Sequence, residues 1–295
     1  MATQQSYYVP EQSKWPIIAT VGLFLTLVGV GTVMMNNTQG TDPTTGWWMF
    51  GIGFTVLIYM LFGWFGSVAK ESMAGLYSEQ MDRSFRWGMS WFIFSEVMFF
   101  SAFFGALFYA RFLAVPWLAG EGDGAMNTLL WPEFERAWPL LSNPDPNLFP
   151  GPKEVISPWQ IPLLNTLLLL SSSVTITIAH HAIKKDERSK VKLWLAATVL
   201  LGAIFMGFQI YEYIHAYQYL DLTLSSGIYG TTFFMLTGFH GMHVTLGAII
   251  LFVILMRYMK GHFTPKQHFG FEAAAWYWHF VDVVWVCLFV FVYIM

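Results

Sequence analysis

Seven long apolar stretches constrain the fold of this chain more than any other feature. A membrane-spanning helix needs about 20 mostly apolar residues, whereas a barrel strand needs only about 9–11 alternating ones. These stretches are too long and too uniformly apolar for strands, and lipid offers the backbone no hydrogen bonds. The sequence therefore predicts an all-α membrane protein with seven transmembrane helices. The predicted helices are Trp15–Met35, Trp47–Val68, Trp87–Leu113, Ile161–Ile183, Leu193–Tyr213, Ile228–Met256 and Phe271–Tyr293.

The composition excludes several classes of function. Only 11% of the 295 residues are charged, and 56% are hydrophobic. A soluble domain carries about 25% charged residues, so this chain cannot coat a globule in water. Its 15 basic residues and net charge of −3 provide no basic surface for phosphate backbones. A soluble enzyme, a disordered tail and a nucleic-acid-binding protein are therefore excluded.

The basic residues predict the orientation in the membrane. Summed over alternating connections, 12 of the 15 Lys and Arg residues fall on one side of the seven helices. Basic residues are enriched on the cytoplasmic side of membrane proteins. The sequence therefore predicts a cytoplasmic N-terminus and a C-terminus on the opposite side.

The connections predict how the chain is organised. We expect residues 1–295 to form a single membrane domain with a two-helix part, 15–68, and a five-helix part, 87–295. The polar connection Lys70–Arg86 separates these parts. The connection 114–160 is rich in Pro and Trp, lies on the predicted outer side and is too long for a tight turn, so we expect it to pack against another element.

Glu96 is the first candidate functional residue, because an ionisable group inside a membrane costs at least a few kcal/mol. It lies about ten residues into the third predicted helix, among apolar neighbours. Two interpretations stand side by side. Glu96 is either a proton-relay group or a structural acid hydrogen-bonded to a neighbouring helix.

Four polar residues form two pairs at helical spacing. His240 and His243 are three residues apart on the sixth helix, and His279 and Asp282 are three apart on the seventh. Ligands from two helices can build a metal site in a helix bundle. No Cys partner or Glu-x-x-His motif accompanies them, so a structural network of interhelical hydrogen bonds is favoured over a metal or haem site.

Other polar residues predict packing or interfacial roles. Glu212 and Glu272 belong to the same expected polar network, and both lie near predicted helix ends, where side chains can snorkel to the interface. Asn165 of the fourth helix suits close helix packing. His180 lies at the predicted cytoplasmic end of that helix, where an interfacial or lipid role is favoured over metal binding.

A basic cluster follows the sixth helix. Arg257, Lys260 and His262 lie together on the predicted cytoplasmic side. Such a cluster between helix ends can bind a phospholipid head group. The alternative is ordinary cytoplasmic charge with no bound ligand.

Several motifs closely resemble the subunit III family of cytochrome c oxidase, a haem–copper oxidase. They occur in the family's order between the third and the seventh helix. The matching stretches are Ser95–Phe100, Pro162–Thr166, Ala179–His181, Gly230–Phe234, Gly238–Val244 and His268–Trp285.

This resemblance implies a fold and a function. The fold is a two-helix and a five-helix bundle separated by a phospholipid-filled cleft. The family carries no haem or copper, which reside in partner subunits I and II, and the complex oxidises cytochrome c and translocates protons. The subunit stabilises the catalytic subunit I and is associated with proton uptake and sustained turnover.

The resemblance also assigns residues. Glu96 matches the family's carbodiimide-reactive glutamate, and further positions match the lipid contacts. Gln267 stands where some relatives have histidine, which departs from the family's lipid site. The long connection 114–160 suggests a bacterial chain in the inner membrane. The matched lipid positions are Trp64, Glu71, Phe92, Arg257 and His262.

Three alternatives remain at this stage. Subunit III of a quinol oxidase is one, although such relatives lack the first two helices. An autonomous membrane redox protein could hold haem or metal on His240, His243 and His279. A transporter would require broken helices around a polar cavity, yet the spans hold few charged groups.

Overall fold

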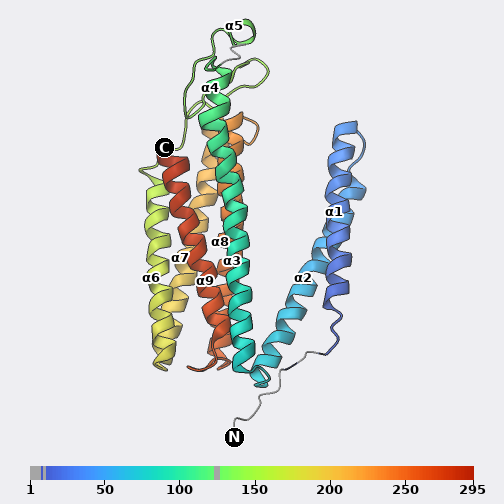
Figure 1. Cartoon of the computed structure of the whole chain (residues 1–295), viewed down its shortest axis with the longest axis vertical. Helices are drawn as coiled ribbons and strands as arrows, with labels where there is room; N and C mark the ends of the chain where they lie inside the picture. The colour runs from blue at the N-terminus through green and yellow to red at the C-terminus, as the bar shows by residue number, and fades with distance from the viewer. Residues whose placement is uncertain (1–7, 9–10, 123–126) are drawn as a thin grey trace. The chain divides into compact units, whose positions relative to one another are not determined.

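The computed structural model describes residue 8, residues 11–122 and residues 127–295. Among these residues, seven helices are long and apolar enough to cross a membrane, which confirms the predicted number of spans and the all-α class. The chain divides into two compact units, Met1–Phe85 and Arg86–Met295. We call them the two-helix unit and the five-helix unit (Figure 1).

The two-helix unit is a hairpin of α1 (Trp15–Gln39) and α2 (Thr44–Met73). Gly40 ends α1 in a left-handed conformation with φ of 67°. The Asp42 carboxylate then accepts hydrogen bonds from the backbone and hydroxyl of Thr44 at 3.0 and 2.6 Å, and these bonds lower the pKa of Asp42. The short turn therefore returns the chain directly into α2 as an antiparallel neighbour.

Glycines allow the two helices of the hairpin to touch. Gly29 of α1 and Gly46 and Gly53 of α2 are buried. A Cβ atom added at any of them would collide with backbone atoms of the facing helix. Small interface residues permit such close approach in membranes, where packing and interhelical contacts rather than the hydrophobic effect hold helices together.

The five-helix unit contains most of α3 (Glu79–Tyr109) together with α6 (Ile161–Lys184), α7 (Arg188–Tyr219), α8 (Ile228–Met259) and α9 (Phe269–Leu288). A π-helical segment, η1 (Ala110–Ala114), and the short α4 (Val115–Leu118) extend α3, and η2 (Phe289–Ile294) extends α9. In Figure 1 these helices run along one another. Among the spans, the one that contains α9 has the largest buried share.

Trp278 of α9 forms the centre of the five-helix unit. The side chain is fully buried, and its indole N–H donates to Oγ of Ser172 on α6 at 2.8 Å. Its ring lies against Gly202 of α7 and Gly247 of α8, where an added Cβ would come within 2.7 and 2.9 Å of ring atoms. One side chain therefore joins four helices.

In its described residues, the connection between α4 and α6 contains one short helix, α5 (Asn127–Leu130), and it packs on the turn between α7 and α8. The Lys153 backbone N–H donates to Leu220 at 2.8 Å, and its ammonium pairs with Asp221 at 2.6 Å. The Trp138 ring meets Tyr229 edge to face, with centroids 5.6 Å apart. These contacts confirm the expectation that this connection is packed.

Several helix ends differ from the sequence prediction. The prediction that Lys70–Arg86 is a connection is wrong for most of these residues, because α2 continues to Met73 and α3 already begins at Glu79. Likewise, α7 spans Arg188–Tyr219 rather than Leu193–Tyr213. Hydropathy detects where the chain is apolar, whereas backbone hydrogen bonds continue through polar residues beyond the bilayer core. The apolar stretches therefore underestimate the helices.

Candidate functional site

The Glu96 carboxyl group pairs with the His243 imidazole inside the five-helix unit. Oε2 of Glu96 on α3 lies 2.8 Å from Nε2 of His243 on α8. Nδ1 of the same ring lies 2.6 Å from the Phe239 carbonyl oxygen, so it carries the hydrogen and donates. His243 is buried, and the Phe100 ring packs against it with centroids 5.0 Å apart.

This geometry places one shared proton between the two groups. With Nδ1 acting as a donor, the pair is either a neutral acid donating to Nε2 or a carboxylate accepting from an imidazolium. In both cases a hydrogen lies between Oε2 of Glu96 and Nε2 of His243. The pair can therefore hold a proton within the membrane and also ties α3 to α8.

Replacing Glu96 by glutamine is expected to leave the assembly intact. The amide can donate to Nε2 of His243 while Nδ1 continues to donate to Phe239, so no buried polar atom loses its partner. Glu96→Leu is the matched control and leaves Nε2 unpaired, at a cost of roughly 1 kcal/mol for an interhelical bond in a membrane. Subunit content on native gels and thermal dissociation measure both variants. Complete disassembly of the Glu96→Gln complex would contradict this account.

A second polar cluster surrounds the Glu272 carboxylate at the start of α9. One oxygen, Oε2, pairs with the guanidinium of Arg86 on α3. The other, Oε1, lies 3.2 Å from Nε2 of His180 on α6 and 3.3 Å from Nε2 of His268. The expectation that Glu272 snorkels is wrong, because basic groups from other helices meet it inside the protein. His180 makes this contact from the end of α6, and its expected interfacial role stays a prediction.

The same cluster contains a possible set of metal ligands. The ligand atoms of His180, His268 and Glu272 all lie within 4.8 Å of one another. Imidazole and carboxylate are suitable ligands for several divalent metals. The guanidinium of Arg86, however, already places a positive charge on the same carboxylate. The prediction that the chain binds no metal stays a prediction.

Glu212 of α7 lies in a buried cluster at the opposite end of the bundle. Its Oε1 accepts a hydrogen bond of 2.6 Å from the hydroxyl of Tyr293 in η2 and lies 3.4 Å from Nε2 of Gln209. The expected snorkelling of Glu212 is therefore also wrong, because a phenol from the C-terminal end of the chain reaches it. The interaction fixes η2 against α7.

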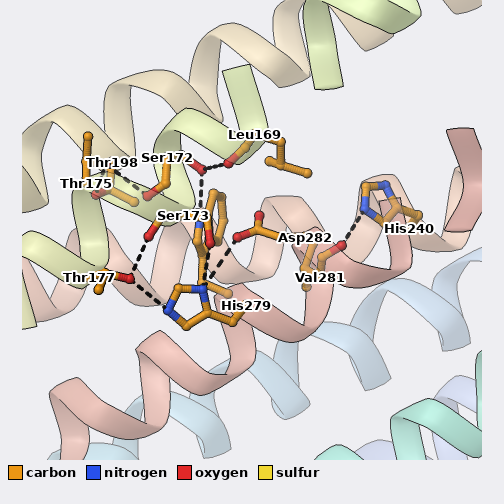
Figure 2. A network of polar contacts seen from close by, with 11 residues as sticks. Leu169, Ser172, Ser173, Thr175, Thr177, Thr198, His240, His279, Val281 and Asp282 are labelled. Carbon is orange, nitrogen blue, oxygen red and sulfur yellow. Dashed lines mark hydrogen bonds and ion pairs between the residues drawn. The ribbon is translucent and has the colours of Figure 1, made fainter. Parts of the chain in front are cut away.

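The predicted His–Asp pair on α9 forms a network with α6, which Figure 2 shows. Nδ1 of His279 lies 2.7 Å from Oγ of Ser173 and 3.7 Å from Oδ2 of Asp282. Nε2 of His240 on α8 instead lies 3.2 Å from the Val281 carbonyl oxygen. His240, His243 and His279 thus have three different sets of partners, and their assignment to a structural network stays a prediction.

The predicted lipid-binding cluster lies at the end of α8, and Arg257 belongs to the last turn of that helix. The guanidinium of Arg257 lies over the Phe263 ring, 4.7 Å from its centroid. Nε of Arg257 and Nδ1 of His262 are buried and have no hydrogen-bond partner among the described residues. Lys260 lies exposed between them in the sequence. These groups are therefore available for an anionic ligand.

The remaining predicted lipid positions have separate surroundings. In the two-helix unit, Trp64 is exposed and stacks on Phe65, and Glu71 accepts a hydrogen bond of 2.8 Å from Tyr77. Burial raises the pKa of the Tyr77 phenol, and the Glu71 carboxylate raises it further. In the five-helix unit, Phe92 stacks on a tyrosine of α9.

Sequence reasoning missed the partners that complete these clusters. Arg86 was assigned only to a basic connection, and the role of Tyr293 was not predicted. Each partner comes from a helix distant in sequence, so no local spacing identifies it. The only signal was general: a buried charge requires an opposite charge or a hydrogen bond elsewhere in the fold.

Comparisons with known proteins show similarity over nearly the whole chain. The family model described as cytochrome c oxidase subunit III matches residues 5–121 and 146–295. Cytochrome c oxidase subunit 3 of Arabidopsis thaliana is 40% identical over 291 residues, covering 98% of this chain and 96% of the relative. Cytochrome c oxidase subunit 3 of Marchantia polymorpha is 39% identical, covering 99% of this chain and 97% of the relative. The same subunit of Drosophila melanogaster is 38% identical, covering 97% of this chain and 95% of the relative.

Proposed function

Because this chain belongs to the cytochrome c oxidase subunit III family, we propose that it is an accessory subunit without a redox centre of its own. Membership of the family implies a complex with other oxidase subunits and makes the chain a multi-pass membrane protein. The observation that carries the proposal is the family match over nearly the whole chain. The acidic groups support it, since Glu96, Glu212 and Glu272 each have a hydrogen-bond or ion-pair partner within the chain.

The proposed complex is a proton-pumping cytochrome c oxidase. Haem and copper in partner subunits I and II would pass electrons from cytochrome c to oxygen. This chain would stabilise subunit I, its main contact, and would support both proton uptake and sustained turnover. The names of the relatives favour cytochrome c over quinol as the electron donor.

Glu96 is the proposed proton-related residue. The contact of 2.8 Å between its carboxyl group, in the middle of α3, and the imidazole of His243 supports this proposal. Inside a bilayer such a group is costly unless it has a partner or a function. We assign it to proton-uptake support and not to catalysis.

Phospholipid binding is proposed for Arg257, Lys260 and His262. The half-buried guanidinium and the imidazole offer unpaired nitrogen atoms to a phosphate group, and Lys260 adds charge. Trp64, Glu71 and Phe92 remain further proposed lipid contacts. We also propose that the chain lies in the bacterial inner membrane with its N-terminus in the cytoplasm. The long connection 114–160 and the excess of basic residues on one side of the spans support this proposal.

Replacing Arg257 by alanine is expected to loosen lipid binding and shorten the turnover lifetime of the complex. A basic residue near a membrane surface contributes about 1 kcal/mol to anionic lipid binding, which corresponds to roughly fivefold weaker binding. Lys192→Ala removes an exposed basic residue from α7 and is the matched control. Lipid mass spectrometry of the purified complexes and activity over time measure the effect. Unchanged lipid content in Arg257→Ala would remove the basis of this assignment.

Affinity purification tests the proposed function as a whole. A tag on the C-terminus of the full chain allows its isolation from membranes in mild detergent. Mass spectrometry is expected to find haem–copper subunits I and II in equal amounts with this chain. Purification of the chain with no oxidase subunit would overturn the proposal.

A further inference from the structure

A polar group is exposed on the membrane-facing surface where α6 meets α9. The His279 side chain is 40% exposed, although its neighbour Asp282 is buried. Thr177 of α6, beside the same imidazole, is also exposed. We call this surface the α6–α9 seam; it consists of Leu170, Val174 and Thr177 of α6 and His279, Val283 and Val286 of α9.

The polar centre of the seam lies near the middle of two membrane-spanning helices. His279 is near the midpoint of the 26-residue span Phe269–Ile294, and Ser173 is near the midpoint of the 24-residue α6. At about 1.5 Å per residue, His279 is roughly 15 Å from the start of its span. The hydrocarbon core is about 30 Å thick, so the imidazole cannot snorkel to either interface.

The hydrogen bonds within the seam do not satisfy the imidazole. The Thr177 hydroxyl already donates to the Ser173 carbonyl oxygen at 2.9 Å, so it can only accept from Nε2 of His279. That contact measures 3.4 Å, which is long for such a bond. If Nε2 instead carries a lone pair, Thr177 has no hydrogen left to donate to it. In either tautomer Nε2 lacks a good partner (Figure 2).

We propose that the α6–α9 seam receives a transmembrane helix of another oxidase subunit, which supplies a hydrogen-bonding group to His279. Acyl chains cannot hydrogen-bond, and polar side chains inside membranes nearly always face a protein interior or a water-filled cavity. The apolar residues on both sides of the imidazole provide a packing surface for such a helix. This inference rests on the proposed function, because it requires a multisubunit complex.

Photo-crosslinking in the intact complex tests the inference. A benzophenone amino acid replaces Val283, which is 63% exposed and lies one turn from His279. Leu200 of α7, 61% exposed, is the matched control position. After irradiation of native membranes, mass spectrometry is expected to find an adduct with a transmembrane peptide of another oxidase subunit at position 283 and lipid adducts at position 200.

Each other outcome at position 283 overturns the inference. These outcomes are adducts with lipid alone, with a second copy of this chain, or with residues 15–73 of the same chain. The tagged purification described above separates the two proposals. If oxidase subunits copurify while position 283 labels only lipid, the inference fails and the proposed function stands.

Two substitutions of His279 provide an independent readout. His279→Gln keeps a donor and an acceptor, whereas His279→Leu keeps neither. Loss of this chain from the complex in detergent is expected to be about three- to twenty-fold faster in His279→Leu, from the size of interhelical bonds in membranes, and near normal in His279→Gln. Equal loss rates in wild type and His279→Leu would overturn the inference.

Discussion

Replacing Trp278 by alanine is expected to destabilise the five-helix unit by about 3 kcal/mol, the lower end of the range for such a truncation. The fully buried indole fills the space between α6, α7 and α8, so its removal leaves a cavity against Gly202 and Gly247. The value is at the lower end because unfolded helices remain in lipid, where burying apolar surface gains little. The expected loss of stability comes from the van der Waals contacts of the ring and from its hydrogen bond to Ser172.

Two further variants separate the contributions of Trp278. Trp278→Phe keeps most of the ring volume but removes the donor to Ser172, so an intermediate loss is expected. Trp159→Ala removes an equally large but exposed side chain and should change little. The temperature at which this chain dissociates from the purified complex measures all three. Equal shifts for Trp278→Ala and Trp159→Ala would show that the indole is not the centre of the unit.

Replacing Gly29 by leucine is expected to separate α1 from α2. An added Cβ would overlap the backbone of Phe50, which cannot move aside as a flexible side chain can. The helices should move towards the about 8–10 Å interaxial distance of ordinary helix pairs. Gly31→Leu, two residues further on the same helix, is the control, since an added Cβ there meets nothing within 4 Å.

Distances between spin labels measure this separation. Cysteines in place of Ile17 on α1 and Phe62 on α2 carry the labels, because both side chains are exposed. Serine replaces Cys287, the one native cysteine, so that it is not labelled. A longer and broader distance distribution is expected for Gly29→Leu and an unchanged one for Gly31→Leu. Identical distributions in the two variants would contradict the close glycine contact.

The seven spans were predictable because a single local property determines them. Each helix that crosses the membrane must be apolar along about 20 residues, and this pattern is visible in a window of sequence. The helix ends were not predictable in the same way. Arg188 and Glu79 begin helices although they are charged, since backbone hydrogen bonding outside the bilayer core does not require apolar side chains.

The polar clusters were predictable only in part. The high cost of ionisable groups inside a membrane marked Glu96, His243 and Asp282 as residues that need partners. The identity of the partners depends on which helices become neighbours. Glu96 and His243 are 147 positions apart, and the contact between them arises only when α3 packs on α8.

Glu212 illustrates why proximity to a helix end can mislead. Its position near the end of an apolar stretch suggested an interfacial side chain. In the structure α7 continues to Tyr219, and the hydroxyl of Tyr293 reaches the carboxyl group from the other end of the chain. The burial of Glu212 therefore depends on the packing of η2, which no pattern around residue 212 describes.

The distribution of haem and copper tests the central claim that this chain is an accessory subunit without a redox centre. Detergent treatment of the purified complex can release this chain, after which absorption spectra and metal analysis are recorded for the released chain and for the remaining subunits. All haem and copper are expected to remain with the other subunits, which should keep their initial rate of cytochrome c oxidation but lose activity sooner during turnover. Haem or copper in stoichiometric amounts on the released chain would contradict the account.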